Sequence, residues 1–305
     1  MTYLWKLIPY DKSTMIYMQE LMNVKVVTTV EQVKATVKTW REEGKTIGFV
    51  PTMGYLHEGH ESLIKKSVAE NDVTVVSIFV NPMQFGPKED LASYPRDLEA
   101  DTKLCNNAGA NLIFHPEPSE MYKDGFASYV DVNGLTNALC GLSRPGHFRG
   151  VCTVVTKLFN IVTPDKAYFG EKDAQQLAVI KRMVTDLNMN LEIVGCPIIR
   201  EDDGLAKSSR NTYLSPNTRQ EALIISKSIF MGKKMIEDGE RDAAKVIQAI
   251  KDSISSSSLM DIDYVEIVDV NTMENIAEIK GDILCAVAVR ANGEARLIDN
   301  FMMSV

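Results

Sequence analysis

The amino-acid sequence predicts an α/β protein, in which a doubly wound parallel sheet is followed by a smaller C-terminal α+β domain. Three observations support this fold class. Short β-branched runs alternate with helix-spaced stretches between about residues 24 and 198. Beyond about residue 200, two helical stretches precede three strand-like runs. The length of 305 residues is at the upper edge for one domain and comfortable for two.

The first part of the chain repeats the order strand, then helix. Residues 24–40 contain a short β-branched run followed by a helical stretch. The predicted strands that follow are 46–50, 73–80, 111–114, 166–169 and 191–199. The predicted helices are 61–70, 97–108, 151–162 and 173–187. Because repeated βα units build a parallel sheet covered by helices, we expect a Rossmann-like domain over residues 23–198.

The second part of the chain follows a different order. The helical stretches are 218–238 and 241–254, and the strand-like runs are 262–270, 283–289 and 295–303. Helices followed by adjacent strands predict a small α+β domain over residues 199–305. Residues 1–22 are predicted to be an extension outside the fold, because Met22-Asn23-Val24 would itself make a plausible start of the chain.

The composition excludes several classes of protein. The net charge of -8 comes from scattered acidic residues, so no nucleic-acid partner is indicated. No run approaches the roughly 18 apolar residues of a membrane span, and the first 22 residues lack a signal-peptide core. The five cysteines are widely spaced and predict reduced thiols: Cys105, Cys140, Cys152, Cys196 and Cys285. We therefore expect a cytoplasmic protein without a membrane partner.

The sharpest motif is the run from Pro51 to His60, which lies between the first predicted strand of the alternating region and a helix. Ligands gather at the carboxyl ends of strands in such sheets, and a helix N-terminus attracts phosphate. His57 and His60, with Gly59 between them, could donate hydrogen bonds to triphosphate oxygens as charge develops in a transition state. The alternatives are surface histidines or half of a zinc site, but a zinc site lacks third and fourth ligands nearby.

The His57-x-Gly59-His60 element resembles the HIGH motif of class I aminoacyl-tRNA synthetases and related nucleotidyltransferases. That superfamily has a second phosphate-binding loop far downstream, named KMSKS. The run from Lys207 to Asn211, Lys-Ser-Ser-Arg-Asn, resembles this loop. Taken alone it could equally be an ordinary polar loop.

Further motifs make the resemblance specific. They are Asn81–Gly86 with Tyr94-Pro95-Arg96, Arg144–Gly150, Phe169–Leu177, and Asp203–Ala206 ahead of the Lys207 loop. Six ordered motifs with consistent spacing resemble the pantothenate synthetase family from Val24 to the C-terminus. The resemblance implies that ATP and pantoate form pantoyl adenylate, and that β-alanine then displaces AMP to give pantothenate. It also implies Mg²⁺, a homodimer, and a C-terminal domain that closes over the site as a lid.

The resemblance assigns roles to individual residues. The implied catalytic residues are His60, His57, Lys172, Ser208, Ser209 and Arg210, with His60 as the proton donor. The implied ATP-binding residues are Met53, Gly54, Tyr55, Leu56, His57, Glu58, Gly59, His60, Gly170, Glu171, Lys172, Asp173, Ile199, Lys207, Ser208, Ser209 and Arg210. The implied pantoate ligands are Gln84 and Gln176, with Gln84 also near β-alanine and Asn81 in support. Asp101 is a weaker candidate for binding Mg²⁺.

Position 207 departs from the family pattern, because many relatives carry Met or Leu before Ser-Ser-Arg. Lys207 could add charge near the triphosphate or point to solvent, and the sequence favours neither. The other two histidines, His115 and His147, are expected to be structural or at the edge of the site. Two rival functions stay open: a cofactor-type nucleotidyltransferase that leaves the nucleotidyl group on its product, and a non-catalytic nucleotide-binding module.

Overall fold

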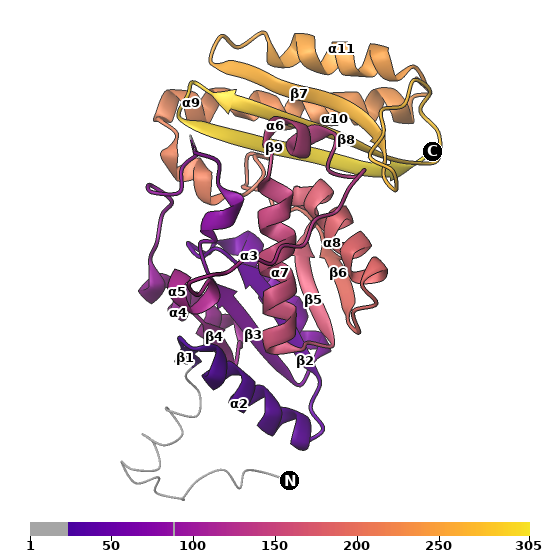
Figure 1. Ribbon diagram of the computed structural model, residues 1–305. Coiled ribbons are helices and arrows are strands. Elements are labelled where there is room, and N and C mark those ends of the chain that lie inside the picture. Colours follow the sequence, from indigo (N-terminus) through magenta and orange to yellow (C-terminus); the bar gives the residue numbers. More distant parts are fainter. Residues whose placement is uncertain (1–23, 88) are drawn as a thin grey trace, which may run out of the picture.

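The computed structural model describes residues 24–87 and 89–305. The predicted extension, residues 1–22, lies outside the described residues. Within the described part, Figure 1 shows a larger unit, built on a parallel sheet, beneath a smaller unit in which two helices cover an antiparallel sheet. No helix among these residues is both long and apolar enough to cross a membrane.

The larger sheet confirms the predicted doubly wound topology. Its strands are β1 (Lys25–Val27), β2 (Ile47–Thr52), β3 (Val73–Ile78), β4 (Leu112–Phe114), β5 (Lys166–Gly170) and β6 (Glu192–Cys196). They lie in the order β1-β4-β3-β2-β5-β6, and every neighbouring pair is parallel. The chain proceeds from β2 toward β4 on one side and toward β6 on the other. The strand order therefore reverses between β2 and β5, which is where such sheets bind ligands.

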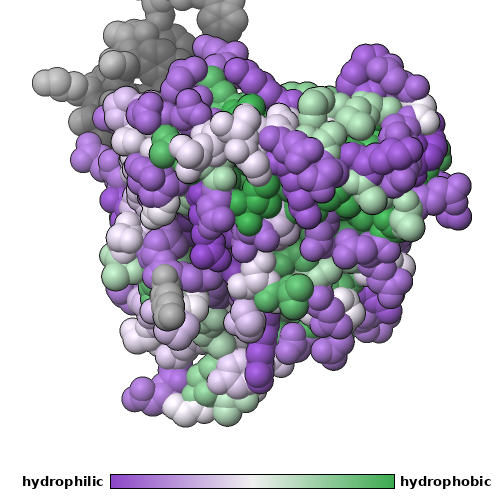
Figure 2. Space-filling model, turned by 90° about the horizontal axis from the view of Figure 1, so that it is seen from above, coloured by the Kyte–Doolittle hydropathy of each residue, from purple (hydrophilic) through white to green (hydrophobic). Residues whose placement is uncertain are grey.

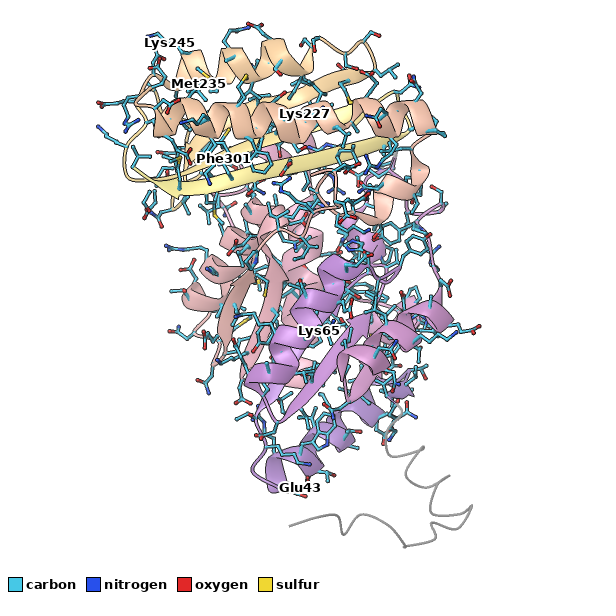
Figure 3. All side chains as sticks on the ribbon, turned by 180° about the vertical axis from the view of Figure 1, so that it is seen from behind. Glu43, Lys65, Lys227, Met235, Lys245 and Phe301 are labelled. Carbon is cyan, nitrogen blue, oxygen red and sulfur yellow. The ribbon has the colours of Figure 1, made fainter. Side chains whose placement is uncertain are left out.

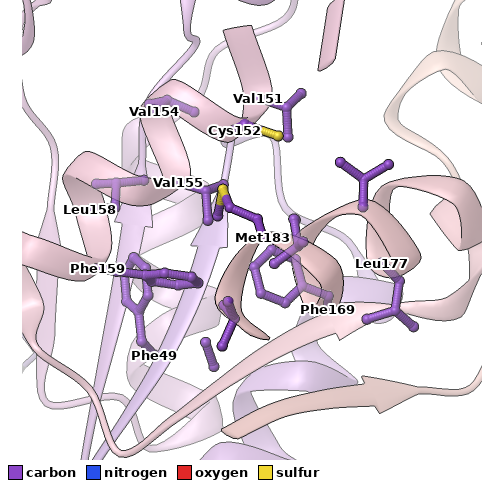
Figure 4. Close-up of a cluster of buried hydrophobic side chains, with 14 of the residues drawn as sticks. Phe49, Val151, Cys152, Val154, Val155, Leu158, Phe159, Phe169, Leu177 and Met183 are labelled. Atoms are coloured by element: carbon purple, nitrogen blue, oxygen red, sulfur yellow. The ribbon is translucent and has the colours of Figure 1, made fainter. Parts of the chain in front are cut away.

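Helices cover both faces of this sheet. They are α2 (Val30–Glu42), α3 (Glu58–Glu70), α4 (Leu98–Ala108), α7 (His147–Val162) and α8 (Ala174–Asp186), with the short α5 (Pro118–Met121) and α6 (Leu139–Ser143). Side chains alternate along each strand, so that Phe49 packs with α2, α7 and α8 whereas Val50 packs with α3 and α4. Figure 4 shows the first of these cores, in which Phe159 meets Phe49 edge to face, with ring centroids 6.3 Å apart.

Several predicted boundaries were wrong by a few residues. The strand predicted over 191–199 ends at Cys196, because Pro197 has no N–H to donate to a neighbouring strand. The helix predicted from residue 61 begins at Glu58, where His57 provides the cap. The helix predicted from residue 151 begins at His147, because buried Phe148 already belongs to its apolar face.

The smaller unit contains a three-stranded antiparallel sheet in the order β7 (Met260–Asp269), β8 (Asp282–Ala291) and β9 (Ala295–Ser304). Helices α10 (Leu223–Glu237) and α11 (Ala243–Ile254) cover one face and enclose their own core (Figure 3). The helix predicted over 218–238 is divided into α9 (Pro216–Glu221) and α10 by a tighter turn, in which Ile225 N–H donates to Ala222 O at 3.1 Å. Hydrophilic side chains cover most of the outer face of this unit (Figure 2).

The opposite face of the small sheet meets the larger unit. Val268, Leu284 and Ala286 belong to the same apolar core as α7 and α8. Figure 1 shows α6 beside the small sheet, although α6 precedes β5 in the chain. The described structure thus contains the predicted α+β arrangement, and the division at residues 198 and 199 stays a prediction.

Candidate active site

A cleft of about 920 Å³ lies between the carboxyl ends of the parallel strands and the small sheet. Most of the predicted site residues line it: Met53, His57, Gly59, His60, Asn81, Gln84, Gly170, Lys172, Asp173, Gln176, Ile199, Lys207, Ser208, Ser209 and Arg210. Six predicted residues do not line it: Gly54, Tyr55, Leu56, Glu58, Glu171 and Asp101. The fold therefore brings together motifs that are far apart in the sequence.

His57 and His60 form the N-terminal cap of α3. His57 Nδ1 accepts from Gly59 N–H at 3.1 Å, and His60 Nδ1 accepts from His57 N–H at 3.2 Å. A side chain at position 59 would place its Cβ 2.8 Å from the His57 ring, so glycine is required there. The two ring centroids are 4.1 Å apart, which places both imidazoles at the same end of the helix.

The protonation state of these histidines follows from their environment. Burial lowers the pKa of His60 to about 3, with help from the nearby His57 and Lys172 charges. Burial also lowers the pKa of His57 to about 4, together with Lys172 and Lys207. Both rings are therefore neutral at pH 7. Since each Nδ1 is an acceptor, each proton is on Nε2, which leaves two neutral N–H donors for an anion.

Asp101 supports the loop ahead of these histidines. One carboxylate oxygen accepts from Tyr55 N–H at 2.9 Å and the other from Leu56 N–H at 2.6 Å. The side chain is buried on α4. Through these two hydrogen bonds Asp101 shapes the loop, and its role toward Mg²⁺ stays a prediction.

The two predicted pantoate ligands come from different elements, Gln84 from a short turn over Pro82–Gln84 after β3 and Gln176 from α8. Gln84 Nε2 lies 2.9 Å from Met53 Sδ, and Gln84 Oε1 accepts from Asn81 Nδ2 at 3.1 Å. Asn81 Oδ1 in turn accepts from Tyr122 OH at 2.7 Å. A Cβ at Gly150 would lie 2.3 Å from Met83 O, so this glycine allows α7 to approach the turn. Asn81 therefore orients Gln84, and its support of a pantoate pocket stays a prediction.

Side chains of opposite charge join the two halves of the cleft. Lys207 Nζ lies 3.0 Å from Glu58 Oε2, and whether its charge also acts on the triphosphate stays a prediction. Arg210 donates to both oxygens of Asp90, at 2.9 and 3.0 Å. Ser209 Oγ lies 3.4 Å from Tyr55 O. The loop after β6 is thus held against the HIGH-like motif.

Sequence reasoning did not single out Glu89, Arg144 or Asn300, all of which line the cleft. Arg144 donates to both Glu89 oxygens at 2.6 Å. Burial alone would raise the pKa of Glu89, but the Arg144 contact lowers it to about 2. His147 Nδ1 lies 2.9 Å from Gln84 O, and His147 also lines the cleft. Of the three residues that sequence reasoning missed, only Arg144 lies within a motif, the run from Arg144 to Gly150, and no motif contains Glu89 or Asn300.

Neutral imidazole donors at a helix N-terminus, cationic side chains and a topological switch point together define a class of protein. This class is the α/β proteins that bind a phosphate-bearing ligand at the carboxyl ends of the parallel strands. A family model described as Pantoate-beta-alanine ligase matches residues 25–302. The chain therefore belongs to the pantoate-beta-alanine ligase family, and its function is that of a pantothenate-forming ligase.

Individual relatives agree with this assignment. The chain is 60% identical over 278 residues to the pantothenate synthetase of Ruminiclostridium cellulolyticum, covering 91% of this chain and 98% of the relative. It is 59% identical over 273 residues to that of Enterococcus faecalis, covering 90% and 96%. The solved pantothenate synthetase of Thermus thermophilus superposes with a TM-score of 0.87 at 45% identity, covering 91% of this chain and 99% of that one.

A further solved relative was captured with ligands. The Pantoate-beta-alanine ligase of Francisella tularensis, described as complexed with Beta-gamma ATP and Beta-alanine, has a TM-score of 0.75 at 34% identity. The similarity covers 92% of this chain and 97% of that one.

Proposed function

We propose that this ligase joins (R)-pantoate to β-alanine in two half-reactions within the one cleft. In the first, a pantoate carboxylate oxygen attacks the α-phosphorus of ATP, and pyrophosphate leaves with the bonding electron pair. In the second, the β-alanine amine attacks the acyl carbon, loses a proton and displaces AMP. The products are pantothenate, AMP and pyrophosphate, and neither step needs a covalent bond to the enzyme.

The neutral histidines act in the first half-reaction. Each Nδ1 is occupied by a backbone N–H, so each Nε2–H is directed as a donor. Such donors stabilise phosphate oxygens as negative charge moves onto the leaving pyrophosphate, and they are already in place before the reaction begins. Because the pKa of His60 is lowered to about 3, His60 acts as a neutral hydrogen-bond donor and not as an imidazolium at neutral pH.

Cations and hydroxyl groups complete the binding of the triphosphate. Lys172, Ser208, Ser209 and Arg210 line the same cleft as the histidines. The enzyme must hold two anions, pantoate and ATP, close together while negative charge grows on the leaving pyrophosphate. Fixed positive charge therefore lowers the activation barrier. Burial lowers the pKa of Lys172, and the carboxylates of Asp173 and Asp299 oppose this effect and favour the charged ammonium.

Gln84 and Gln176 bind pantoate. Neutral amides can accept from hydroxyl groups and donate to a carboxylate without neutralising the nucleophile. Gln84 is buried and already oriented by Asn81. A ligand would replace the weak contact of Gln84 Nε2 with Met53 Sδ by a hydrogen bond to oxygen.

The observation that supports this proposal most strongly is that two neutral histidines, His57 and His60, line the same cleft as Gln84 and Gln176. Purified protein should convert ATP, pantoate and β-alanine into AMP, pyrophosphate and pantothenate. With ATP and pantoate alone, it should form enzyme-bound pantoyl adenylate and release pyrophosphate. Retention of the nucleotidyl group on a phosphorylated acceptor would instead favour the nucleotidyltransferase alternative. Binding of ATP without any turnover would favour a binding module.

Two further features are proposed from the resemblance alone: Mg²⁺ as a companion of ATP, and a homodimer. A cytoplasmic location is proposed from the sequence pattern. The residues that the structure describes contain no group of three or more His, Cys, Asp or Glu side chains that could hold a metal ion. No step above depends on the metal ion. Activity in the presence of a chelator tests the first feature, and light scattering tests the second.

A further inference from the structure

Asn300 reaches from the small sheet into the turn that carries Lys172. This asparagine lies on β9 and is 5% exposed. Its Nδ2 donates to two successive backbone carbonyls, Glu171 O at 3.0 Å and Lys172 O at 2.8 Å. A single buried amide group therefore holds both carbonyls of a turn that is distant in the sequence.

The turn itself has little other support from side chains. Glu171–Asp173 form one 3-10 turn after β5, and the residue at its N-terminal end is Gly170, which has no side chain that could cap the turn. Asp173, at the start of α8, makes no capping hydrogen bond through its side chain. Because the Lys172 side chain extends from this turn into the cleft, the position of its ammonium depends on the turn's backbone.

Asn300 is fixed in place by its neighbour on β9. Asp299 accepts from Arg200 at 2.7 and 2.8 Å through both oxygens, and its side chain is 2% exposed. Arg200 also donates to Gly204 O at 3.1 Å, within the segment that leads to the Lys207 loop. Asp299 Oδ1 in turn lies 2.8 Å from Asn300 N. The Arg200–Asp299 ion pair thus connects β9 to the segment that follows β6.

We propose that Asn300 is a positioning residue for Lys172 in the adenylation step. It sets the backbone of the Glu171–Asp173 turn from the opposite side of the cleft, so the lysine is correctly placed only when the small sheet is docked. This inference rests on the proposed function, because it assumes that Lys172 acts on the triphosphate. A misplacement of about 1 Å at such a group can cost roughly a hundredfold in rate.

The first test is Asn300→Asp, which keeps the shape of the side chain and replaces the donor by an acceptor. The carboxylate would face two carbonyl oxygens, so the turn should shift. The expected result is a fall of roughly 10-fold to 100-fold in kcat for pyrophosphate release from ATP and pantoate, with little change in the KM for pantoate. Asn271→Asp is the matched control, because Asn271 is exposed in the turn after β7. It should behave as the unaltered protein.

The second test asks whether Asn300 acts through Lys172. Lys172→Met should itself reduce kcat for adenylation, and adding Asn300→Asp to it should then change kcat by less than about threefold, because residues that act as a unit are not additive. The proposal would be overturned if the double variant lost kcat by the product of the two separate factors. An Asn300→Asp protein with unaltered kcat would also overturn it. A lower melting temperature with unchanged kcat would assign Asn300 a purely structural role.

If the aspartate variant does not fold, Asn300→Ser decides the question. Its hydroxyl can donate one hydrogen bond, so kcat should fall and should again combine with Lys172→Met without further loss. Unaltered kcat in this variant overturns the proposal. Failure of the proposed function itself would look different, because the unaltered protein and the Asn271→Asp control would then also make no pantothenate.

Discussion

Arg210 and Asp90 form a two-bond ion pair across the mouth of the cleft, with Nε to Oδ2 at 2.9 Å and Nη2 to Oδ1 at 3.0 Å. The guanidinium is thus already ordered before any phosphate binds, and its plane is fixed by Asp90. Charged side chains held in this way can stabilise a transition state without reorganising during the reaction.

Replacement of Arg210 should separate the two half-reactions. Arg210→Ala is expected to slow adenylation on the order of 10²-fold to 10³-fold, because a fixed charge beside the leaving pyrophosphate is lost. Supplied with preformed pantoyl adenylate, the variant should still acylate β-alanine within a few-fold of the normal rate, because that step releases AMP and moves no pyrophosphate. Single-turnover assays of each step measure both rates. Arg182→Ala, which removes an exposed arginine on α8, is the control.

A comparable collapse of both half-reactions in the Arg210 variant would contradict this assignment. It would show that the Asp90 pair organises the whole site and that Arg210 has no special relation to pyrophosphate.

Loss of the His60 donor should affect catalysis more than binding. His60→Ala is expected to lower kcat for adenylation on the order of 10²-fold to 10³-fold, because the Nε2–H bond strengthens as charge develops. The dissociation constant for ATP, measured by calorimetry, should change much less. His115→Ala is the matched control, since His115 lies outside the cleft lining and contacts Ile78 O. Near-normal turnover of the His60 variant would remove this histidine from the mechanism.

The buried histidines also predict how stability depends on pH. The pKa of His57 is lowered to about 4 and that of His60 to about 3, from an ordinary value of 6.5. The unfolded chain therefore binds more protons than the folded one below pH 6.5, so the folded state loses stability as pH decreases from about 6.5 toward 4. Urea denaturation across this range should show a smaller slope with pH in His57→Gln than in the unaltered protein. Equal slopes would contradict the assigned protonation states.

Lys207 should contribute to ATP binding through its charge. It lies 3.0 Å from the exposed Glu58 carboxylate, at the N-terminus of α3 where an anion is favoured. Lys207→Met should raise the KM for ATP by roughly twofold to fivefold, the range expected for a partly exposed ion pair, with a smaller change in kcat. Lys65→Met removes a similar exposed pair elsewhere on α3 and should leave the KM unchanged.

Glu58→Gln tests the same Lys207–Glu58 contact by removing the charge of the carboxylate instead of that of the lysine. If the carboxylate competes with phosphate for Lys207, this variant should bind ATP at least as tightly as the unaltered protein. An equal KM for ATP in the unaltered protein, Lys207→Met and Glu58→Gln would show that the Lys207 charge does not contribute to ATP binding.

The sequence predicted the elements whose patterns are local. The β-branched run at β3 and the helical spacing in α8 depend on neighbours in the chain, so both were found. The motifs also predicted which loops gather at the strand ends, because parallel strands end at one edge of the sheet.

Contacts between distant segments could not be predicted in this way. Whether Lys207 meets Glu58 or solvent depends on how the loop after β6 lies against α3. Asn300 occupies an ordinary position on a strand, and only the docking of the small sheet shows what its amide binds. The hydrogen bonds of Asp101 to the backbone of Tyr55 and Leu56 join segments about 45 residues apart and were likewise not predicted.

The position of α6 has a consequence for recombining this chain with its relatives. The short helix is encoded ahead of β5, yet it packs beside β7, and Cys140 at its start lies 3.5 Å from Tyr264 OH. A hybrid exchanged at the predicted boundary near residue 198 would pair an α6 from one parent with a small sheet from the other. The natural unit of exchange is therefore discontinuous and includes residues 139–143 together with the C-terminal part.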